Sequence, residues 1–457
     1  MTDREVYTFY GDKKVTFPDF SGEILLLEPQ PFQKTFKDWK DEFKRVISNP
    51  INSEPLAALL NGNYSAGSSI VIIVDDYTRP NIHTRIILPF LLQTLIELDV
   101  QKQDLKILLA TGSHRAATGE EIVFCVGEKV ANEYKGQIFS HDYTAGNKVF
   151  GHTKNGTPID INHMAVEACL IIPLTDSELH YFAGVAGTIK SITPGISSRT
   201  TIQLNHSKIF DKKIGFHPGC RLGNVKGNPV ITEFKEIVRV LSSKIPIFGI
   251  DCIVANNEIV YLAAGNLINL HDQAIDIITR IRSITVKEPA DLVIVNPGIL
   301  GINLYQSGKG THAAWNAARK PGGSILCLAP CPDGVGNEAY AKTMDAIKDF
   351  SVQEALEHVI DHYCGPETFK IGNQKPVDLL RIIKTLGEDH LFVMTEMDAK
   401  TLYDVFRMNK VDPADDPSTA FQEFIRNFVV NHHKPETELK IYIINDPGLN
   451  VQIKVEN

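Results

Sequence analysis

Side chains that could exchange protons or form a covalent bond gather in one glycine-rich stretch of the sequence. His180 opens this stretch, Lys190 follows ten residues later, and His206 closes it after sixteen more. These spacings are too long for one helical face, but glycines allow the chain to fold back on itself. Histidine can act as acid or base near neutral pH, and a lysine in apolar surroundings becomes a nucleophile or a covalent attachment point. We therefore expect the reactive centre here.

Three other polar stretches follow apolar runs and could contribute to the same chemistry. Asp76 and Arg79 follow residues 70–74 as either a local ion pair or a carboxylate-binding fork. His114 follows residues 105–110, and an acid–base group and a histidine tied into a helix start are equally compatible with its position. The run 303–310 suits recognition of an oxygen-rich anion, and equally suits a polar helix start.

The elements that must position these residues alternate between strands and helices. The runs 69–74, 105–110 and 169–174 are apolar on both faces, which is typical of buried parallel strands. The alternation stops near residues 283–290 and then restarts. This pattern predicts an α/β protein of two domains, 1–284 and 285–457, with largely parallel sheets flanked by helices. Because ligands bind beyond the carboxyl ends of such strands, we expect the active site in the cleft between the domains.

A phosphate-binding P-loop is a competing interpretation of the central stretch. Gly184, Lys190 and Ser191 fall in register with the motif. Ile189 stands where the motif needs a glycine for close approach of the backbone to phosphate, so a P-loop is disfavoured.

Two other classes of function stay open on the residues alone. His114, His180 and His206 could form a three-histidine zinc site with an open position, which would make the protein a zinc-dependent hydrolase. The same loops could instead bind a small anion without catalysis.

The composition of the chain limits the kinds of partner that we expect for it. The chain has 457 residues, a net charge of −9 and no long basic run, which argues against nucleic acid. No apolar run reaches the roughly 18 residues of a membrane span. Seven scattered cysteines suit a reducing compartment, and the amino terminus shows neither a secretory nor a transit pattern. We expect a cytoplasmic protein with no nucleic-acid or membrane partner.

Taken together, the loops resemble the nickel-dependent lactate racemase family. The matching runs, in the family's order, are D-D-Y-T-R-P (75–80), A-T-G-S-H-R (110–115), H-Y-F-A-G (180–184), G-T-I-K-S-I-T-P-G (187–195), N-H (205–206) and Y-Q-S-G-K (305–309). The resemblance spans roughly residues 15 to 430 and both predicted domains.

The resemblance implies a cofactor. It is a nickel-pincer nucleotide, nickel pyridinium-3,5-bisthiocarboxylic acid mononucleotide, joined covalently to Lys190 with His206 as the protein's nickel ligand. Ser191 and Asp76 match further cofactor-site positions. Recombinant protein from a host that cannot make this cofactor would lack it, so cofactor-synthesis enzymes are expected as transient partners.

The resemblance also implies an activity and a substrate. The family's reaction inverts the C2 centre of a 2-hydroxy acid by reversible hydride transfer to the cofactor, with His114 and His180 as the acid–base pair. The residues that match substrate-binding positions are Arg79, Lys309, Tyr305 and Gln306. Lactate is the default substrate, and the family includes enzymes for larger 2-hydroxy acids.

One departure from the family pattern lies beside the attachment lysine. The family's usual run is Gly-Gly-x-Lys, with x often arginine, whereas this chain has Thr188 and Ile189 between Gly187 and Lys190. The missing second glycine and arginine are expected to change how the cofactor is held or which substrate is accepted.

Overall fold

The chain forms two compact units in the computed structural model, which describes residues 5–28, 32, 34–255, 257–318, 321–445 and 451–456. The amino-terminal unit comprises Pro31–Lys208 and Pro218–Ile281, and the carboxy-terminal unit comprises Met1–Gln30, Ile209–His217 and Arg282–Asn457. The predicted domains, 1–284 and 285–457, differ from these units in residues 1–30, 209–217 and 282–284. Strand pairing explains the first difference, because β3 (Glu23–Leu27) pairs in parallel with β21 (Lys440–Ile444).

The amino-terminal unit is built on a six-stranded sheet in the order β15-β14-β9-β4-β5-β6. All neighbours in it are parallel except β14 and β15, which form an antiparallel pair. The central strand β4 begins with four aliphatic residues, 70–73, that have no exposed surface, as burial on both faces requires. The strands are β4 (Ile70–Asp75), β5 (Leu105–Ala110), β6 (Ile138–Ser140), β9 (Leu170–Asp176), β14 (Gly249–Ala255) and β15 (Glu258–Gly265).

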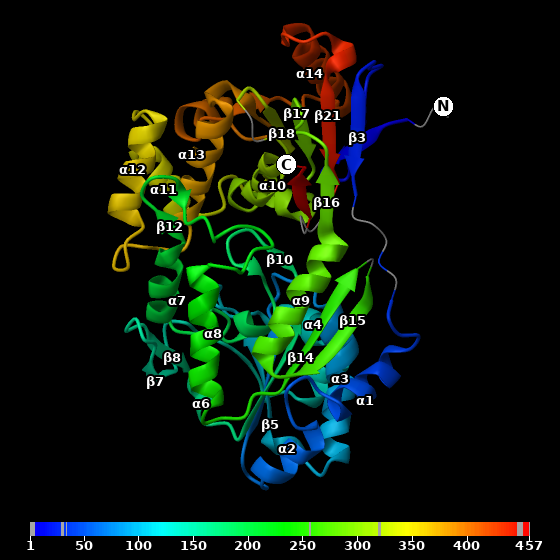
Figure 1. The fold of residues 1–457 in the computed structure, drawn as a ribbon, viewed down its shortest axis with the longest axis vertical. Helices are drawn as coiled ribbons and strands as arrows, with labels where there is room; N and C mark the ends of the chain where they lie inside the picture. The colour runs from blue at the N-terminus through cyan, green and yellow to red at the C-terminus, as the bar shows by residue number, and fades with distance from the viewer. Residues whose placement is uncertain are drawn as a thin grey trace. The chain divides into compact units, whose positions relative to one another are not determined.

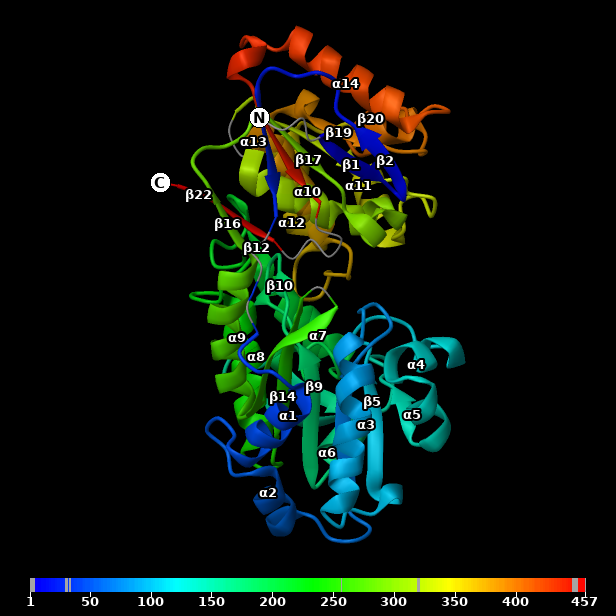
Figure 2. The ribbon, with the colours of Figure 1, turned by 90° about the vertical axis from the view of Figure 1, so that its right-hand side faces the viewer.

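Helices cover both faces of this sheet. Figure 2 shows α3, α4 and α5 on one side of the strands and α8 on the other. The core on the α3 side combines aliphatic residues of α1 to α5 with alternate residues of the strands. The helices are α1 (Trp39–Ser48), α2 (Leu56–Asn63), α3 (Ile82–Glu97), α4 (Gly119–Val126), α5 (Glu128–Glu133), α6 (His163–Val166), α7 (Arg199–His206), α8 (Pro229–Ser242) and α9 (Leu267–Arg282).

The carboxy-terminal unit contains a second six-stranded sheet, in the order β20-β19-β18-β17-β21-β3, and every pair in it is parallel. Figure 1 shows α10 beside β17 and β18, while α14 and the β1–β2 hairpin supply the core of the other face. The remaining strands of the sheet are β17 (Leu292–Val295), β18 (Ser324–Leu328), β19 (Leu391–Met394) and β20 (Asn409–Val411). The helices are α10 (Leu304–Ala318), α11 (Glu338–Ala346), α12 (Val352–Tyr363), α13 (Gln374–Leu386) and α14 (Pro417–Asn431).

Short two-stranded sheets and single helical turns complete both units. The sheets pair β1 (Tyr7–Tyr10) with β2 (Lys13–Thr16), β7 (Asn147–His152) with β8 (Pro158–Asn162), β10 (Leu179–His180) with β11 (Gly184–Val185), β12 (Phe210–Asp211) with β13 (Gly215–Phe216), and β16 (Ser283–Val286) with β22 (Gln452–Val455). The turns are η1 (Lys102–Asp104), η2 (Thr188–Ser191), η3 (Ser207–Ile209), η4 (Gly298–Ile302), η5 (Glu388–His390), η6 (Thr401–Val405) and η7 (Glu436–Glu438).

The predicted fold class, α/β with largely parallel sheets flanked by helices, is confirmed. Helix α10 begins at Leu304, so the run 305–309 lies on a helix, in agreement with the polar helix start considered for residues 303–310. Within the described residues, no helix is long and apolar enough to cross a membrane.

The pairing of β3 with β21 can be tested with two neighbouring leucines. Leu27 is 1% exposed and Leu26 is 43% exposed. Because truncating a buried leucine leaves a cavity, Leu27→Ala should destabilise the carboxy-terminal unit by about 2–4 kcal/mol, and Leu26→Ala by less than about 1 kcal/mol. Denaturant unfolding in a Trp39→Phe background, which leaves Trp315 as the fluorescent reporter of this unit, measures both losses. Equal losses would contradict the pairing.

Candidate active site

The carboxyl ends of three adjacent parallel strands carry most of the predicted reactive side chains of the amino-terminal unit. Strand β4 ends at Asp75, and Asp76 follows it. Strand β5 leads to His114, and β9 leads to Glu178 and His180. The strands are in register, with Ile73 of β4 level with residue 108 of β5 and residue 173 of β9. Their loops therefore leave the sheet at the same edge.

His114 forms a close pair with Asp76. Its Nδ1 lies 2.6 Å from Asp76 Oδ2, and the hydroxyl of Thr78 donates to the other carboxylate oxygen at 2.6 Å. Burial alone would raise the pKa of Asp76, but the hydrogen bonds and charge of His114 and the bond from Thr78 hold it below its ordinary value. The ionised carboxylate orients the half-exposed imidazole, so Nε2 is the nitrogen that can exchange a proton with a substrate.

Arg79 joins the β4 loop to the β9 loop. Its guanidinium lies 3.2 Å from the Glu178 carboxylate. Burial raises the pKa of nearby Asp75 to about 7; the charge of Arg79 opposes this rise, and the charges of Glu178 and Asp76 add to it. The local ion pair predicted between Asp76 and Arg79 is not found among the described residues, because the guanidinium pairs instead with Glu178 of the β9 loop. The carboxylate-binding fork stays a prediction.

Phe182 lies between three of the predicted residues. Its ring centre is 4.5 Å from that of His180, 5.3 Å from that of His206 and 6.0 Å from the Lys190 Nζ. The backbone amide of Ala183 donates to His180 Nδ1 at 3.2 Å, which places the proton of the neutral ring on Nε2. No role was predicted for Phe182; the signal in the sequence was its place two residues after His180.

His206 is held as a neutral imidazole. It is the last residue of α7 and is 7% exposed. Burial lowers its pKa to about 3, and the positive charge of Lys190 contributes to the decrease. Neutral imidazole is the form that coordinates a metal ion.

A backbone hydrogen bond joins the His114 loop to the Lys190 loop. Gly112 N donates to Gly195 O at 2.9 Å, and Gly195 N donates to Lys190 O at 2.9 Å. Gly112 has a φ of +54°, a conformation that glycine adopts without strain. His114, His180, Lys190 and His206 thus belong to one connected group of loops.

The three-histidine zinc site finds no counterpart in the structure. Among the residues that the structure describes, no group of three or more His, Cys, Asp or Glu side chains is arranged to hold a metal ion. This corrects the zinc-dependent hydrolase alternative, which required His114, His180 and His206 as joint ligands.

Three predicted substrate-binding residues lie in the carboxy-terminal unit, on the first turns of α10: Tyr305, Gln306 and Lys309. The Gln374 side-chain amide donates to the Tyr305 hydroxyl at 3.1 Å. Lys375, for which no role was predicted, is buried with its Nζ 5.8 Å from the Tyr305 ring centre. Burial lowers its pKa to about 8, although Asp378 opposes the shift.

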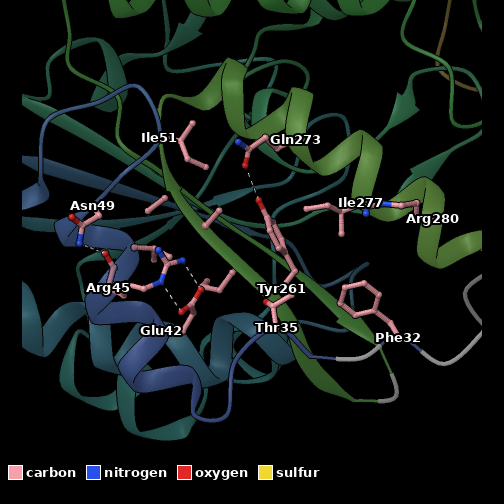
Figure 3. A pocket seen from close by; sticks show the side chains of 14 residues that line it. Phe32, Thr35, Glu42, Arg45, Asn49, Ile51, Tyr261, Gln273, Ile277 and Arg280 are labelled. Atoms are coloured by element: carbon pink, nitrogen blue, oxygen red, sulfur yellow. Dashed lines mark hydrogen bonds and ion pairs between the residues drawn. The ribbon is translucent and has the colours of Figure 1, made fainter.

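A separate cavity of about 360 Å³ lies between α1, β15 and α9. Figure 3 shows its lining, in which Arg45 pairs with Glu42 at 2.7 Å and the Tyr261 hydroxyl lies 3.3 Å from the Gln273 side-chain oxygen. It shares no residue with the group of loops described above, so it is not the predicted reaction centre.

Two family models together match most of the chain. The family model for the lactate racemase N-terminal domain matches residues 10–216, and that for the lactate racemase C-terminal domain matches residues 285–427. The lactate racemase of Thermoanaerobacterium thermosaccharolyticum is 32% identical over 345 residues, covering 74% of this chain and 78% of that protein. The lactate racemase of Lactiplantibacillus plantarum is 32% identical over 326 residues, covering 70% and 73%.

Solved structures show the same fold. The lactate racemase apoprotein from T. thermosaccharolyticum superposes with a TM-score of 0.79 at 27% identity, covering 99% of this chain and all of that one. A protein from Thermotoga maritima superposes with a TM-score of 0.61 at 16% identity, covering 90% and 98%, which is a likeness of fold alone.

The fold is α/β, with a largely parallel sheet whose carboxyl edge leads to loops that bear histidine and carboxyl side chains. The chain belongs to the lactate racemase family and is by that membership an isomerase.

A buried carboxyl group beside the site gives a test of its electrostatics. Asp251 of β14 has no exposed surface and accepts hydrogen bonds from the Thr175 and Ser177 hydroxyls at 2.6 and 2.8 Å. Burial raises its pKa to about 8; the hydroxyls oppose the shift and the charge of Asp75 adds to it. Because the folded-state pKa exceeds the unfolded one, the stability that Asp251 contributes is complete below about pH 4 and is lost as the pH rises toward 8.

Asp251→Asn removes this titration. Wild-type protein should lose unfolding free energy between about pH 5 and 8 more steeply than the variant, by up to about 1.4 kcal/mol per pH unit. Denaturant unfolding in a Trp315→Phe background, with Trp39 reporting on the amino-terminal unit, measures both slopes. Parallel pH profiles would show that Asp251 does not titrate in this range.

Proposed function

We propose that this protein inverts the C2 centre of a 2-hydroxy acid, with lactate as the first substrate to test. The observation that carries the proposal is the connected group of loops that holds the Asp76–His114 pair and the side chains around Phe182. Support also comes from the relatives, which are named lactate racemases at 32% identity.

The chemistry of a 2-hydroxy acid explains why two imidazoles are needed. Its C2 proton is hard to remove, because the neighbouring carboxylate barely stabilises a carbanion. If the hydrogen leaves with its electron pair, a flat keto acid remains that can take the hydrogen back on its other face. The hydroxyl proton must leave at the same time, so each enantiomer of the substrate needs its own base. We assign these two roles to His114 and His180, which lie on loops from different strands.

Family membership brings a nickel-dependent cofactor in general, and the nickel-pincer nucleotide is our specific proposal. The residues fit such a group: His206 is a buried neutral imidazole, and the Lys190 Nζ lies 6.0 Å from the ring centre of Phe182, which also contacts His206. Lys190 would hold the nucleotide covalently and His206 would ligate its nickel. Bound there, the cofactor would accept and return the hydrogen of C2 with its electron pair.

Two residues expected to bind the cofactor have other contacts in the structure. Asp76 hydrogen-bonds His114, so we assign it the orientation of that base. Ser191 Oγ donates to Thr188 O at 2.6 Å, which shapes the turn beneath Lys190. Under these assignments, Asp76 and Ser191 would each act through a neighbouring residue of the protein rather than by contacting the nucleotide.

The substrate carboxylate is assigned to Arg79, since a guanidinium binds carboxylates in a two-pronged geometry. Tyr305, Gln306 and Lys309 remain proposed substrate-binding residues on the strength of the family resemblance. We also propose a cytoplasmic location, with cofactor-synthesis enzymes as transient partners.

Attachment of the cofactor can be measured directly. Protein produced together with nickel and the cofactor-synthesis enzymes should carry an added mass on Lys190 and bind one nickel, because Lys190 supplies the amine and His206 the ligand. Lys190→Ala should lose both, and Lys154→Ala, which removes an exposed lysine of the same unit, should keep both. Peptide mass spectrometry and metal analysis are the measurements. Full racemase activity in unmodified wild-type protein would end the cofactor proposal.

The acid–base pair has its own test. His114→Ala or His180→Ala should each lower the rate of lactate inversion by about 10²–10⁴-fold, because each base serves one enantiomer and inversion needs both. The adduct on Lys190 should survive in both variants. His152→Ala, at an exposed position, is the matched control. Polarimetry starting from each pure enantiomer measures the rates, and wild-type rates in both variants would show that the roles are misassigned.

A further inference from the structure

The loop that carries Lys190 contains a strained residue. Thr188 has a φ of +39°, a left-handed conformation that is costly for a β-branched side chain. This is the position at which the family pattern has its second glycine. A strained residue persists only when its surroundings hold it in place, so the contacts of Thr188 need explanation.

The support comes from the end of β9. Thr188 N donates to Thr175 Oγ1 at 3.0 Å, and the Thr175 hydroxyl donates to Asp251 Oδ1 at 2.6 Å. All three residues are buried, with at most 1% of their surfaces exposed. Because its proton is directed at Asp251, the Thr175 oxygen is oriented to accept the Thr188 amide.

The residue before Thr188 is fixed against the same strand. A Cβ added at Gly187 would lie 2.7 Å from the carbonyl oxygen of Asp176, so the backbone at this point packs directly on the end of β9. Lys190 N then donates to Gly187 O at 2.9 Å. The position of Lys190 therefore follows from how Gly187 and Thr188 sit on the strand.

We propose that Thr175, oriented by Asp251, is a positioning residue that holds the strained Thr188 and thereby sets Lys190 for cofactor attachment. The hydrogen-bond chain is independent of the reaction, whereas its consequence for attachment rests on the proposed function. In this chain the hydrogen bond stabilises the left-handed backbone conformation of Thr188, which a glycine would adopt without such support.

Ser177 provides the matched control. Its hydroxyl donates to the other oxygen of Asp251 at 2.8 Å. Thr175→Val and Ser177→Ala each remove one buried hydroxyl from the same carboxyl group, but only the first removes the acceptor of the Thr188 amide. Thr175→Ser retains the hydroxyl and should behave as wild type.

The first measurement is amide hydrogen exchange in the full-length protein without cofactor, resolved to single residues. Thr175→Val should increase exchange of the Thr188 amide about tenfold or more over wild type, because its buried hydrogen bond is lost. Ser177→Ala should change it less than about threefold. Equal exchange at Thr188 in wild type and Thr175→Val would overturn the inference.

The second measurement is the fraction of Lys190 that carries the cofactor mass after coproduction with the synthesis enzymes. Thr175→Val should lower this fraction severalfold, and adding Thr188→Gly to it should restore the fraction, because glycine adopts the left-handed conformation without support. A fraction unchanged by Thr175→Val, or not restored by Thr188→Gly, would overturn the positioning role. If wild-type Lys190 carries no adduct, the proposed function fails instead, and the exchange measurement still decides the hydrogen-bond chain.

Discussion

The parallel register of β5, β4 and β9 is the constraint on which the site depends. Three strands that run side by side in the same direction must release their chains at one edge, so Asp76, His114 and His180 come together although they are far apart in sequence. The aliphatic residues that line both faces of these strands supply the hydrophobic stabilisation that holds the edge rigid. Loops on such a scaffold can carry polar groups whose own burial is unfavourable.

Burial and charged neighbours leave adjacent groups at this edge of the sheet in different charge states. His206 is kept neutral by desolvation and by the charge of Lys190, as a metal ligand must be. Asp76 is kept ionised by His114 and Thr78 in spite of its burial. The pKa values of Asp75 and Asp251 are raised, because burial outweighs the opposing charge of Arg79 at Asp75 and the opposing hydroxyls of Thr175 and Ser177 at Asp251. An imidazole oriented by an anion and a neutral imidazole near an amine are the groups that the inversion proposed above would use.

The sequence was informative where local patterns decide structure. Runs that are apolar on both faces predicted the central strands β4, β5 and β9 correctly. The sequence could not pair His114 with Asp76, because 38 residues separate them and they are brought together only through strand pairing. Residues 1–30 join the carboxy-terminal unit through β3 and β21, a pairing between opposite ends of the chain that no local pattern contains. No role could be predicted for Phe182, because its contacts with His180, Lys190 and His206 depend on how the loop folds. The strain at Thr188 was visible only as a missing glycine until its φ was known.

The central claim is that the two imidazoles handle the hydroxyl proton of the substrate while the hydrogen on C2 stays out of contact with water. It is tested most directly with one enantiomer of lactate deuterated at C2, converted by cofactor-loaded protein in ordinary water and analysed by mass spectrometry. The account predicts that the opposite enantiomer retains its deuterium. Replacement of that deuterium by solvent hydrogen at the rate of inversion would contradict it, because His114 and His180 would then be removing the C2 proton itself.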